Sequence, residues 1–216
     1  MNLRALVAEF LGVFALCFVG IGAIAATQGG DWMAIALAHG LAIGLSMVAL
    51  GTISGGHFNP AVTFAMLITG RMTPVGAVGY WVAQLLGGLV AAFFIGAIYG
   101  GTAVADGTPA PSTNHTAIQA LMMEVFLTFF LASVFFASAV FNNFSFAGLA
   151  VGLAVTMDIL AGGAVSGAAM NPARVLGPAI IGGEWAAHWV YWVGPLVGAG
   201  LAALLYDFLY SKQVES

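Results

Sequence analysis

Six long runs of apolar residues limit what this chain can fold into. They cover residues 5–26, 32–53, 74–99, 117–140, 144–164 and 185–210. A helix needs about 20 residues to cross the hydrocarbon core of a bilayer, and each run is long enough. The runs are continuous, whereas the strands of a membrane β-barrel alternate apolar and polar residues over about ten positions. The pattern therefore predicts an all-α membrane protein with six transmembrane helices in a lipid bilayer.

The small number of charged side chains excludes several classes of protein. Only 6% of the 216 residues are charged, whereas a soluble domain carries about 25%, so a soluble enzyme and a disordered chain are excluded. The net charge of −4, without any basic run, argues against a nucleic-acid partner. The single cysteine, Cys17, excludes an intramolecular disulfide and a cysteine-based metal cluster. We expect no metal, no other cofactor and no enzymatic activity.

The basic residues predict how the chain is oriented. Six spans place both termini on one side of the membrane, and Arg4, Arg71 and Lys212 all fall on that side. The positive-inside rule makes it the cytoplasmic side. The segment 100–116 is then a loop on the opposite side.

The chain contains an internal repeat. The segment SGGHFNPAVTFAM (54–66) resembles SGAAMNPARVLGP (166–178), and AEFLGVFALCF (8–18) resembles MEVFLTFFLAS (123–133). The two halves are residues 1–100 and 117–216, approximately, within one domain spanning 1–216. Each half has three spans, which is an odd number, so the halves enter the membrane from opposite faces. Inverted repeats of this kind are typical of transport proteins whose site lies near the middle of the membrane.

Two shorter apolar pieces, 59–68 and 171–181, are about half the length that a span requires. Each begins with asparagine followed by proline, a good N-cap and a good first helical residue. Each also follows a glycine-rich stretch, and irregular backbone at membrane depth is tolerated only where it is buried or lines a water-filled path. We expect two half-helices that enter from opposite faces and place their N-termini at the centre.

These motifs resemble the aquaporin, or major intrinsic protein, family. The resemblance rests on the two Asn-Pro-Ala boxes, on AQLLGG (83–88) and on WVGPLVGA (192–199). The boxes consist of Asn59, Pro60, Ala61, Asn171, Pro172 and Ala173. The resemblance implies a bundle of six helices and two half-helices, one pore per subunit and a homotetramer. It also implies that Glu9 and Glu124 accept hydrogen bonds from the backbone of the half-helix loops and support them.

A physical mechanism for passing water follows from this arrangement. The two half-helix N-termini each carry about half a positive charge, which repels cations at the pore centre. The side-chain amides of Asn59 and Asn171 donate to a passing water oxygen and interrupt a proton-conducting chain of waters. Backbone carbonyls of the irregular stretches replace part of the hydration shell. These carbonyls belong to Gly55, Gly56, His57, Phe58, Gly167, Ala168, Ala169 and Met170.

The family forms its narrowest point from an arginine and three further residues. In this sequence these positions map to His39, Ile159, Ala168 and Arg174. Histidine at the first position with isoleucine at the second resembles plant tonoplast intrinsic proteins and ammonia-permeable aquaporins. We therefore expect a passive channel for water and small neutral solutes, including ammonia, that excludes protons and ions. A strict water channel and an ion-coupled carrier of small solutes remain as alternatives.

Two further expectations concern Asp158 and the cellular membrane. Asp158 precedes Ile159, and a buried, hydrogen-bonded role is expected for it. Short tails and a length of 216 residues favour a prokaryotic inner membrane with cytoplasmic termini, whereas the filter favours a vacuolar type. The order of preference among water, ammonia, glycerol, urea and hydrogen peroxide stays open, as does gating.

Overall fold

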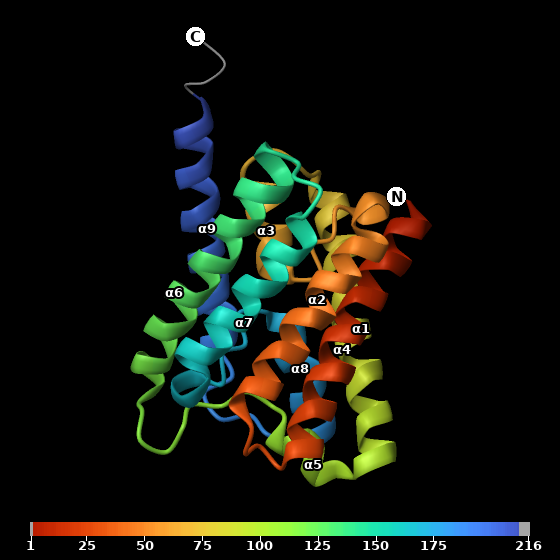
Figure 1. Ribbon diagram of the computed structural model, residues 1–216, viewed down its shortest axis with the longest axis vertical. Coiled ribbons are helices and arrows are strands. Elements are labelled where there is room, and N and C mark those ends of the chain that lie inside the picture. Colours follow the sequence, from red (N-terminus) through yellow and green to blue (C-terminus); the bar gives the residue numbers. More distant parts are fainter. Residues whose placement is uncertain (1, 212–216) are drawn as a thin grey trace.

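The computed structural model describes residues 2–211, and its regular elements over that range are all helices (Figure 1). Six of the described helices are long and apolar enough to cross a membrane. They are α1 (Leu3–Thr27), α2 (Trp32–Ser54), α4 (Pro74–Tyr99), α6 (Ala117–Phe135), α7 (Ala147–Ser166) and α9 (Val190–Ser211). Helix α6 continues into a π-helical turn, η1 (Phe136–Phe141). The prediction of six transmembrane helices is confirmed.

Two shorter helices occupy the predicted half-length pieces. Helix α3 (Pro60–Ile68) and helix α8 (Pro172–Gly182) each begin with proline directly after an asparagine N-cap. The asparagine backbones are extended, with φ of −160° at Asn59 and −155° at Asn171, so each helix starts abruptly.

The structure corrects three expected boundaries. The last span begins at Val190 rather than 185, because the preceding residues form turns and Ala187 has a φ of +47°. Helix α7 begins at Ala147 rather than 144. The expected loop 100–116 contains a short helix, α5 (Gly101–Asp106), which starts after Gly100 turns the chain with a φ of +94°. Lys212, which was used to predict the orientation, lies outside the described residues.

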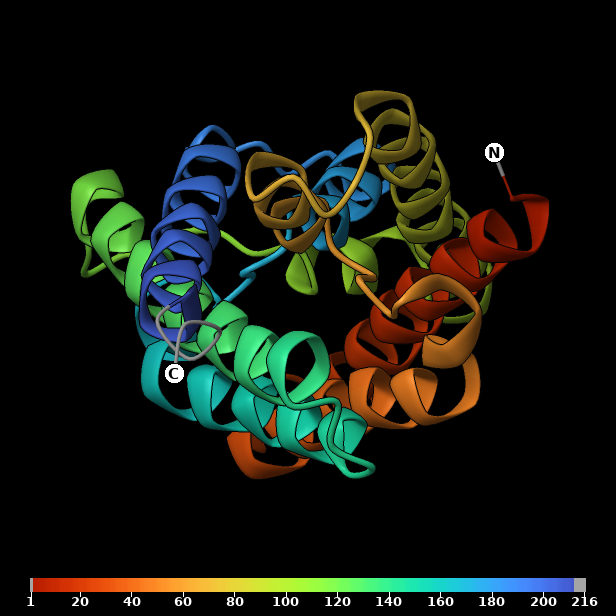
Figure 2. The ribbon, with the colours of Figure 1, turned by 90° about the horizontal axis from the view of Figure 1, so that it is seen from above.

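The helices are arranged as two intertwined halves around a central region. Helix α1 packs mainly on α4, α2 on α7, and α6 on α9. The half-helices lie between α4 and α9, where α8 packs on α4 and α3 packs on α9 (Figure 2). The start of α1 and the end of α9 lie on one face, called the terminal face below (Figure 1). Helices α3 and α8 approach the centre from the terminal face and from the opposite face respectively.

Glycine pairs bring helices α2 and α7 into close contact. Gly40 and Gly44 on α2 face Gly148 and Gly152 on α7. A Cβ atom at Gly40 would overlap the carbonyl oxygen of Gly152 and the hydroxyl of Thr156. Small residues at such positions allow backbones to approach, which drives helix association in a solvent that is itself apolar.

We expect Gly40→Ala to lower the free energy of unfolding by about 1–3 kcal/mol, since the added methyl forces α2 and α7 apart. The matched control is Gly51→Ala on the same helix, where a Cβ atom would meet nothing within 4 Å. Alanine is a better helix former than glycine by about 1 kcal/mol, so the control is expected to be neutral or stabilising. Thermal unfolding of the two purified variants measures the difference, and equal stabilities would contradict the packing role.

Candidate pore

A narrow cavity of about 30 Å³ lies between α1, α2, α6 and α7 and the loops that precede the half-helices. Most of its wall is apolar, with Leu16, Ile43, Leu131, Phe135, Val151 and Val155 among the lining residues. Its polar side chains are His39, His57, Asn171 and Arg174. A water molecule needs about 10–15 Å³ of such space, so the cavity holds only about two or three waters in a row.

A vestibule of about 400 Å³ opens toward the face opposite the termini. It shares three lining residues with the narrow cavity, namely His39, Ile159 and Arg174. These three side chains therefore form the constriction between the two spaces. Ala168 lines the narrow cavity just beyond them. The four residues assigned to the filter from the sequence, which come from α2, α7, a loop and α8, meet at one level of the structure.

Arg174 is almost fully buried, with 3% of its surface exposed. Its Nη1 donates to the carbonyl oxygen of Gly107 at 2.9 Å, and its Nη2 lies 3.4 Å from Nε2 of His39. The Nδ1 atom of His39 lies 2.8 Å from the carbonyl oxygen of Ile35, so Nδ1 carries the proton and Nε2 is left as an acceptor. The Nε atom of Arg174 has no hydrogen-bond partner among the described residues. This Nε atom is itself buried, so within the described residues the constriction holds a guanidinium with one unsatisfied donor.

Reciprocal hydrogen bonds hold the two asparagines that cap the half-helices, of which Asn171 lines the narrow cavity and Asn59 does not. Each side-chain oxygen caps its own half-helix, with Asn59 Oδ1 accepting from Ala61 N and Asn171 Oδ1 from Ala173 N. Each side-chain amide crosses to the other half of the molecule. Asn59 Nδ2 donates to the carbonyl of Met170 at 2.7 Å, and Asn171 Nδ2 donates to the carbonyl of Phe58 at 2.8 Å. One hydrogen of each amide is thereby used, and the second remains to donate elsewhere.

The loops before the half-helices follow the same irregular path in both halves. Positive φ angles occur at Gly55, Gly56 and Phe58 in the first loop, and at Gly167, Ala168 and Met170 in the second. Of the residues whose carbonyls were expected to face the pore, five line the narrow cavity: Gly56, His57, Ala168, Ala169 and Met170. Gly167 lines the vestibule. Gly55 and Phe58 line neither of these two spaces.

Glu9 holds the first loop through four hydrogen bonds, and we call this group the Glu9 cluster. Its Oε1 accepts from His57 N at 3.0 Å and from Ser54 Oγ at 2.7 Å. Its Oε2 accepts from Phe58 N at 2.6 Å and from Gln84 Nε2 at 2.7 Å. The glutamate has no exposed surface. A buried carboxylate normally requires such compensation, and here every donor belongs to a neutral group.

Glu124 occupies the equivalent place in the second half, in a group that we call the Glu124 cluster. It accepts from Ser166 Oγ at 2.7 Å, from Ala169 N at 2.8 Å and from Met170 N at 2.7 Å. Among the described residues, Glu124 has no counterpart of the Gln84 bond. Gln84 lies four residues after Tyr80, and the corresponding position after Tyr191 is Pro195. The two clusters are therefore similar but not identical.

Sequence reasoning missed several residues of these clusters. Ser54 and Ser166 end α2 and α7, and their carbonyls accept from the hydroxyls of Tyr80 and Tyr191 at 2.7 and 2.6 Å. The signal was present, because a Tyr-Trp pair occurs in both repeats at 80–81 and 191–192. Gly107 was missed as well, since only the turn after α5 brings its carbonyl to Arg174.

Asp158 only partly fits the expectation of a buried, hydrogen-bonded carboxylate. It is buried, with 1% of its surface exposed. Its Oδ2 atom, however, has no hydrogen-bond partner among the described residues. Asp158 therefore directly precedes a residue of the constriction, Ile159, in the chain, and one of its carboxylate oxygens is unsatisfied within the described residues.

Comparisons with known proteins agree with this geometry. The family model described as "Major intrinsic protein" matches residues 1–206. The probable aquaporin TIP3-2 of Arabidopsis thaliana is 40% identical over 232 residues, covering 99% of this chain and 86% of the relative. Aquaporin TIP2-1 of the same plant is 41% identical over 227 residues, covering 99% and 90%. The X-ray structure of the aquaglyceroporin from Plasmodium falciparum matches with a TM-score of 0.88 and 26% identity, covering 100% of this chain and 99% of that one.

The comparisons overturn one prediction. Short tails and a small total length favoured a prokaryotic inner membrane, but the curated relatives are plant tonoplast intrinsic proteins, which are proteins of a eukaryotic vacuolar membrane. The prediction failed because the length of the tails has no physical connection with the bilayer that surrounds the spans.

Proposed function

The chain belongs to the major intrinsic protein, or aquaporin, family and is therefore a passive channel for water and small solutes rather than an enzyme, and from that premise we propose that it conducts water and neutral ammonia while excluding protons and ions. This family membership also sets aside the ion-coupled carrier. The remaining alternative is a strict water channel, which the experiment below separates from the proposal.

The observation that carries the ammonia proposal is the two-sided constriction. One wall is polar, with the Arg174 guanidinium beside His39, and the other wall is apolar, with Ile159 and Ala168. Ammonia has one lone pair, and it replaces its lost hydration by accepting a single hydrogen bond from Arg174. Water has two lone pairs and two hydrogens, so an apolar wall in place of a second polar group favours ammonia relative to water. The constriction therefore supports a channel that is less selective for water.

Exclusion of ions is supported by charge at two levels of the pore. Arg174 places a full positive charge in the constriction, and α3 and α8 direct their N-termini toward the centre. A cation must lose its water in a cavity of about 30 Å³ whose walls are mostly apolar, which costs several kcal/mol at least. Asn59 and Asn171 each retain an amide hydrogen that orients a water at the centre and interrupts a proton-conducting chain.

The expected result for Ile159→His is a fall of about two- to tenfold in the ratio of ammonia flux to water flux. The added imidazole supplies a second polar group to the constriction. One net hydrogen bond of about 0.5–1.5 kcal/mol corresponds to roughly this factor. Stopped-flow measurements on proteoliposomes give both fluxes, and Ile159→Leu serves as a volume-matched apolar control. Ammonia flux at the level of protein-free vesicles in the unmodified protein would reject the ammonia proposal. An unchanged ratio in Ile159→His would reject the role of Ile159.

We also propose that four copies of the chain associate into a homotetramer with one pore in each subunit. The support is the family's usual assembly, together with the many large apolar side chains that the isolated chain leaves exposed on its spans. Light scattering combined with size-exclusion chromatography, corrected for bound detergent, measures the mass of the assembly. A monomeric mass in mild detergent and in lipid nanodiscs would contradict it.

A further inference from the structure

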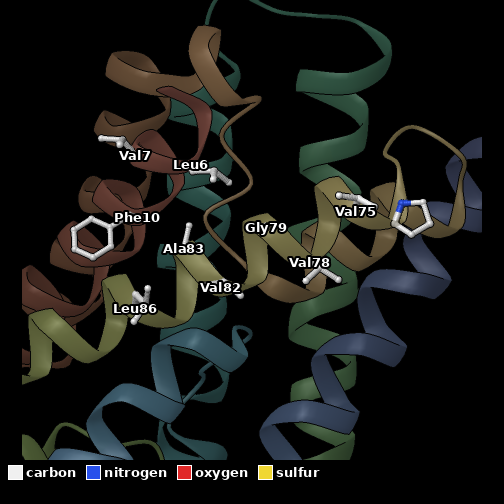
Figure 3. Close-up of a pocket in the computed structure, with 10 residues that line it drawn as sticks. Leu6, Val7, Phe10, Val75, Val78, Gly79, Val82, Ala83 and Leu86 are labelled. Carbon is white, nitrogen blue, oxygen red and sulfur yellow. The ribbon is translucent and has the colours of Figure 1, made fainter. Parts of the chain in front are cut away.

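An apolar groove runs along the outside of the bundle between α1 and α4 (Figure 3). Its volume is about 700 Å³, within the range of pockets that take drug-sized ligands. Helix α1 contributes Leu6, Val7 and Phe10, and α4 contributes Pro74, Val75, Val78, Gly79, Val82, Ala83 and Leu86. Every lining side chain is apolar, and both helices belong to the candidate membrane spans. The groove therefore faces the hydrocarbon of the bilayer.

The shape of the groove suits a flexible chain better than a second protein helix. The small residues Gly79 and Ala83 lie along it on α4, while Phe10 and Leu86 stand beside them (Figure 3). A helix with its side chains is about 10 Å across, which equals the usual spacing of two packed helices such as α1 and α4. Such a helix would rest on the rim and leave the groove unfilled. A hydrocarbon chain is thin and adapts to the floor.

The groove has a positive end at the terminal face. Helices α1 and α4 both begin there, after the N-caps Asn2 and Thr73, so two helix N-termini lie at the same end of the groove. Each N-terminus carries about half a positive charge. Arg4, an exposed residue, lies one helical turn before Val7, which lines the groove. Arg71 does not add to this positive end, because its charge is paired with Asp207 at 2.6 Å.

We propose that this groove is a binding site for a membrane phospholipid. One acyl chain fills the groove between α1 and α4, and the phosphate of the head group lies beside Arg4 and the first turns of both helices. The apolar walls explain the affinity for the acyl chain, and the positive end explains the preference for a phosphate-bearing head group. The site lies outside the pore and adds a ligand that the conduction of water does not require.

The position of the groove also predicts what the lipid does to the protein. The adjoining, inward faces of the same two helices carry the Glu9 cluster, with Glu9 on α1 and Tyr80 and Gln84 on α4. Phe10 lies in the groove and is the neighbour of Glu9 in the chain. A lipid that fills the space between α1 and α4 therefore stabilises the two helices that hold the first half-helix loop.

Native mass spectrometry of the channel in mild detergent tests the proposal with two probes, phosphatidylglycerol and diacylglycerol. We expect phosphatidylglycerol to bind at least fivefold more tightly than diacylglycerol, which lacks the phosphate, and to raise the unfolding temperature. Gly79→Leu fills the groove while improving helix propensity, and it is expected to weaken phosphatidylglycerol binding at least tenfold. Arg4→Gln is expected to reduce the preference for phosphatidylglycerol over diacylglycerol, while both lipids still bind.

The matched control is Ala49→Leu, which adds the same type of side chain on an exposed position of α2 away from the groove. This variant is expected to bind phosphatidylglycerol as the unmodified protein does. Equal lipid binding by Gly79→Leu and the unmodified protein would overturn the proposal. A loss of subunit association in Gly79→Leu without any loss of lipid would also overturn it, because a second copy of the chain would then occupy the groove. Water flux measured on the same variants reports separately on the channel function.

Discussion

Replacing Glu9 with alanine is expected to lower the free energy of unfolding by about 2–6 kcal/mol. The change removes the acceptor of two buried backbone N–H groups, those of His57 and Phe58, and each unsatisfied buried donor costs about 1–3 kcal/mol. The whole stability of a domain is about 5–15 kcal/mol, so this loss is a large fraction of it. The first loop is then expected to lose its shape, and water flux to fall with it.

Glu124→Ala is expected to have a somewhat smaller effect, because Glu124 accepts three hydrogen bonds from the described residues where Glu9 accepts four. The control is Glu184→Ala, at a half-buried glutamate that accepts from Ala186 N beside the vestibule. Thermal unfolding in detergent, followed by tryptophan fluorescence, gives the order of stability. The predicted order places Glu184→Ala highest and Glu9→Ala lowest. A Glu9→Ala variant as stable as Glu184→Ala would show that the Glu9 cluster does not support the loop.

Replacing Arg174 with alanine is expected to raise proton conductance by at least tenfold, and by up to about 10³. A unit charge about 4 Å from a permeating cation repels it by about 4 kcal/mol at an effective dielectric constant of 20, and every 1.4 kcal/mol is a factor of ten. The substitution also removes the largest side chain of the constriction between the cavity and the vestibule. Proton flux into liposomes that contain a pH-sensitive dye measures the change.

Two further variants separate charge from size in this experiment. Arg174→Lys keeps the positive charge but cannot reproduce both bonds, to the Gly107 carbonyl and toward His39, so proton exclusion is expected to persist while the ammonia-to-water ratio changes. Arg4→Ala removes an exposed charge at the terminal face and is expected to leave proton flux unchanged. Proton flux in Arg174→Ala at the level of the unmodified protein would place the barrier elsewhere, at the centre formed by Asn59 and Asn171.

The positions of the long helices could be predicted from hydropathy alone, because a chain in hydrocarbon must satisfy its backbone hydrogen bonds within each span. The limits of α4, for example, agree with the apolar run 74–99 at both ends. The start of α9 could not be predicted this way. The residues before Val190 include Trp185 and Trp189, which are apolar enough to extend the run although the backbone there forms turns.

The repeat and the family resemblance predicted those residues of the candidate site that belong to a motif. They predicted Asn59, Asn171 and Arg174, together with His39, Ile159 and Ala168, which line the narrow cavity with Arg174. They did not identify Gly107 or the tyrosines Tyr80 and Tyr191, because each of these acts on a partner that lies 25 or more residues away in the chain. Nor did they indicate the groove between α1 and α4, whose walls are separated by more than 60 residues.

The order of the residues was thus enough to predict the spans, the inverted repeat and the candidate constriction residues, since each depends on local composition or on a motif. Only the tertiary structure decided which groups satisfy the buried polar atoms, such as the Gly107 carbonyl for Arg174 and the Met170 carbonyl for Asn59. The physical reason is that a hydrogen bond is sensitive to distances of a few tenths of an ångström and to angle. Residues far apart in the chain reach that geometry only when the helices that carry them are packed.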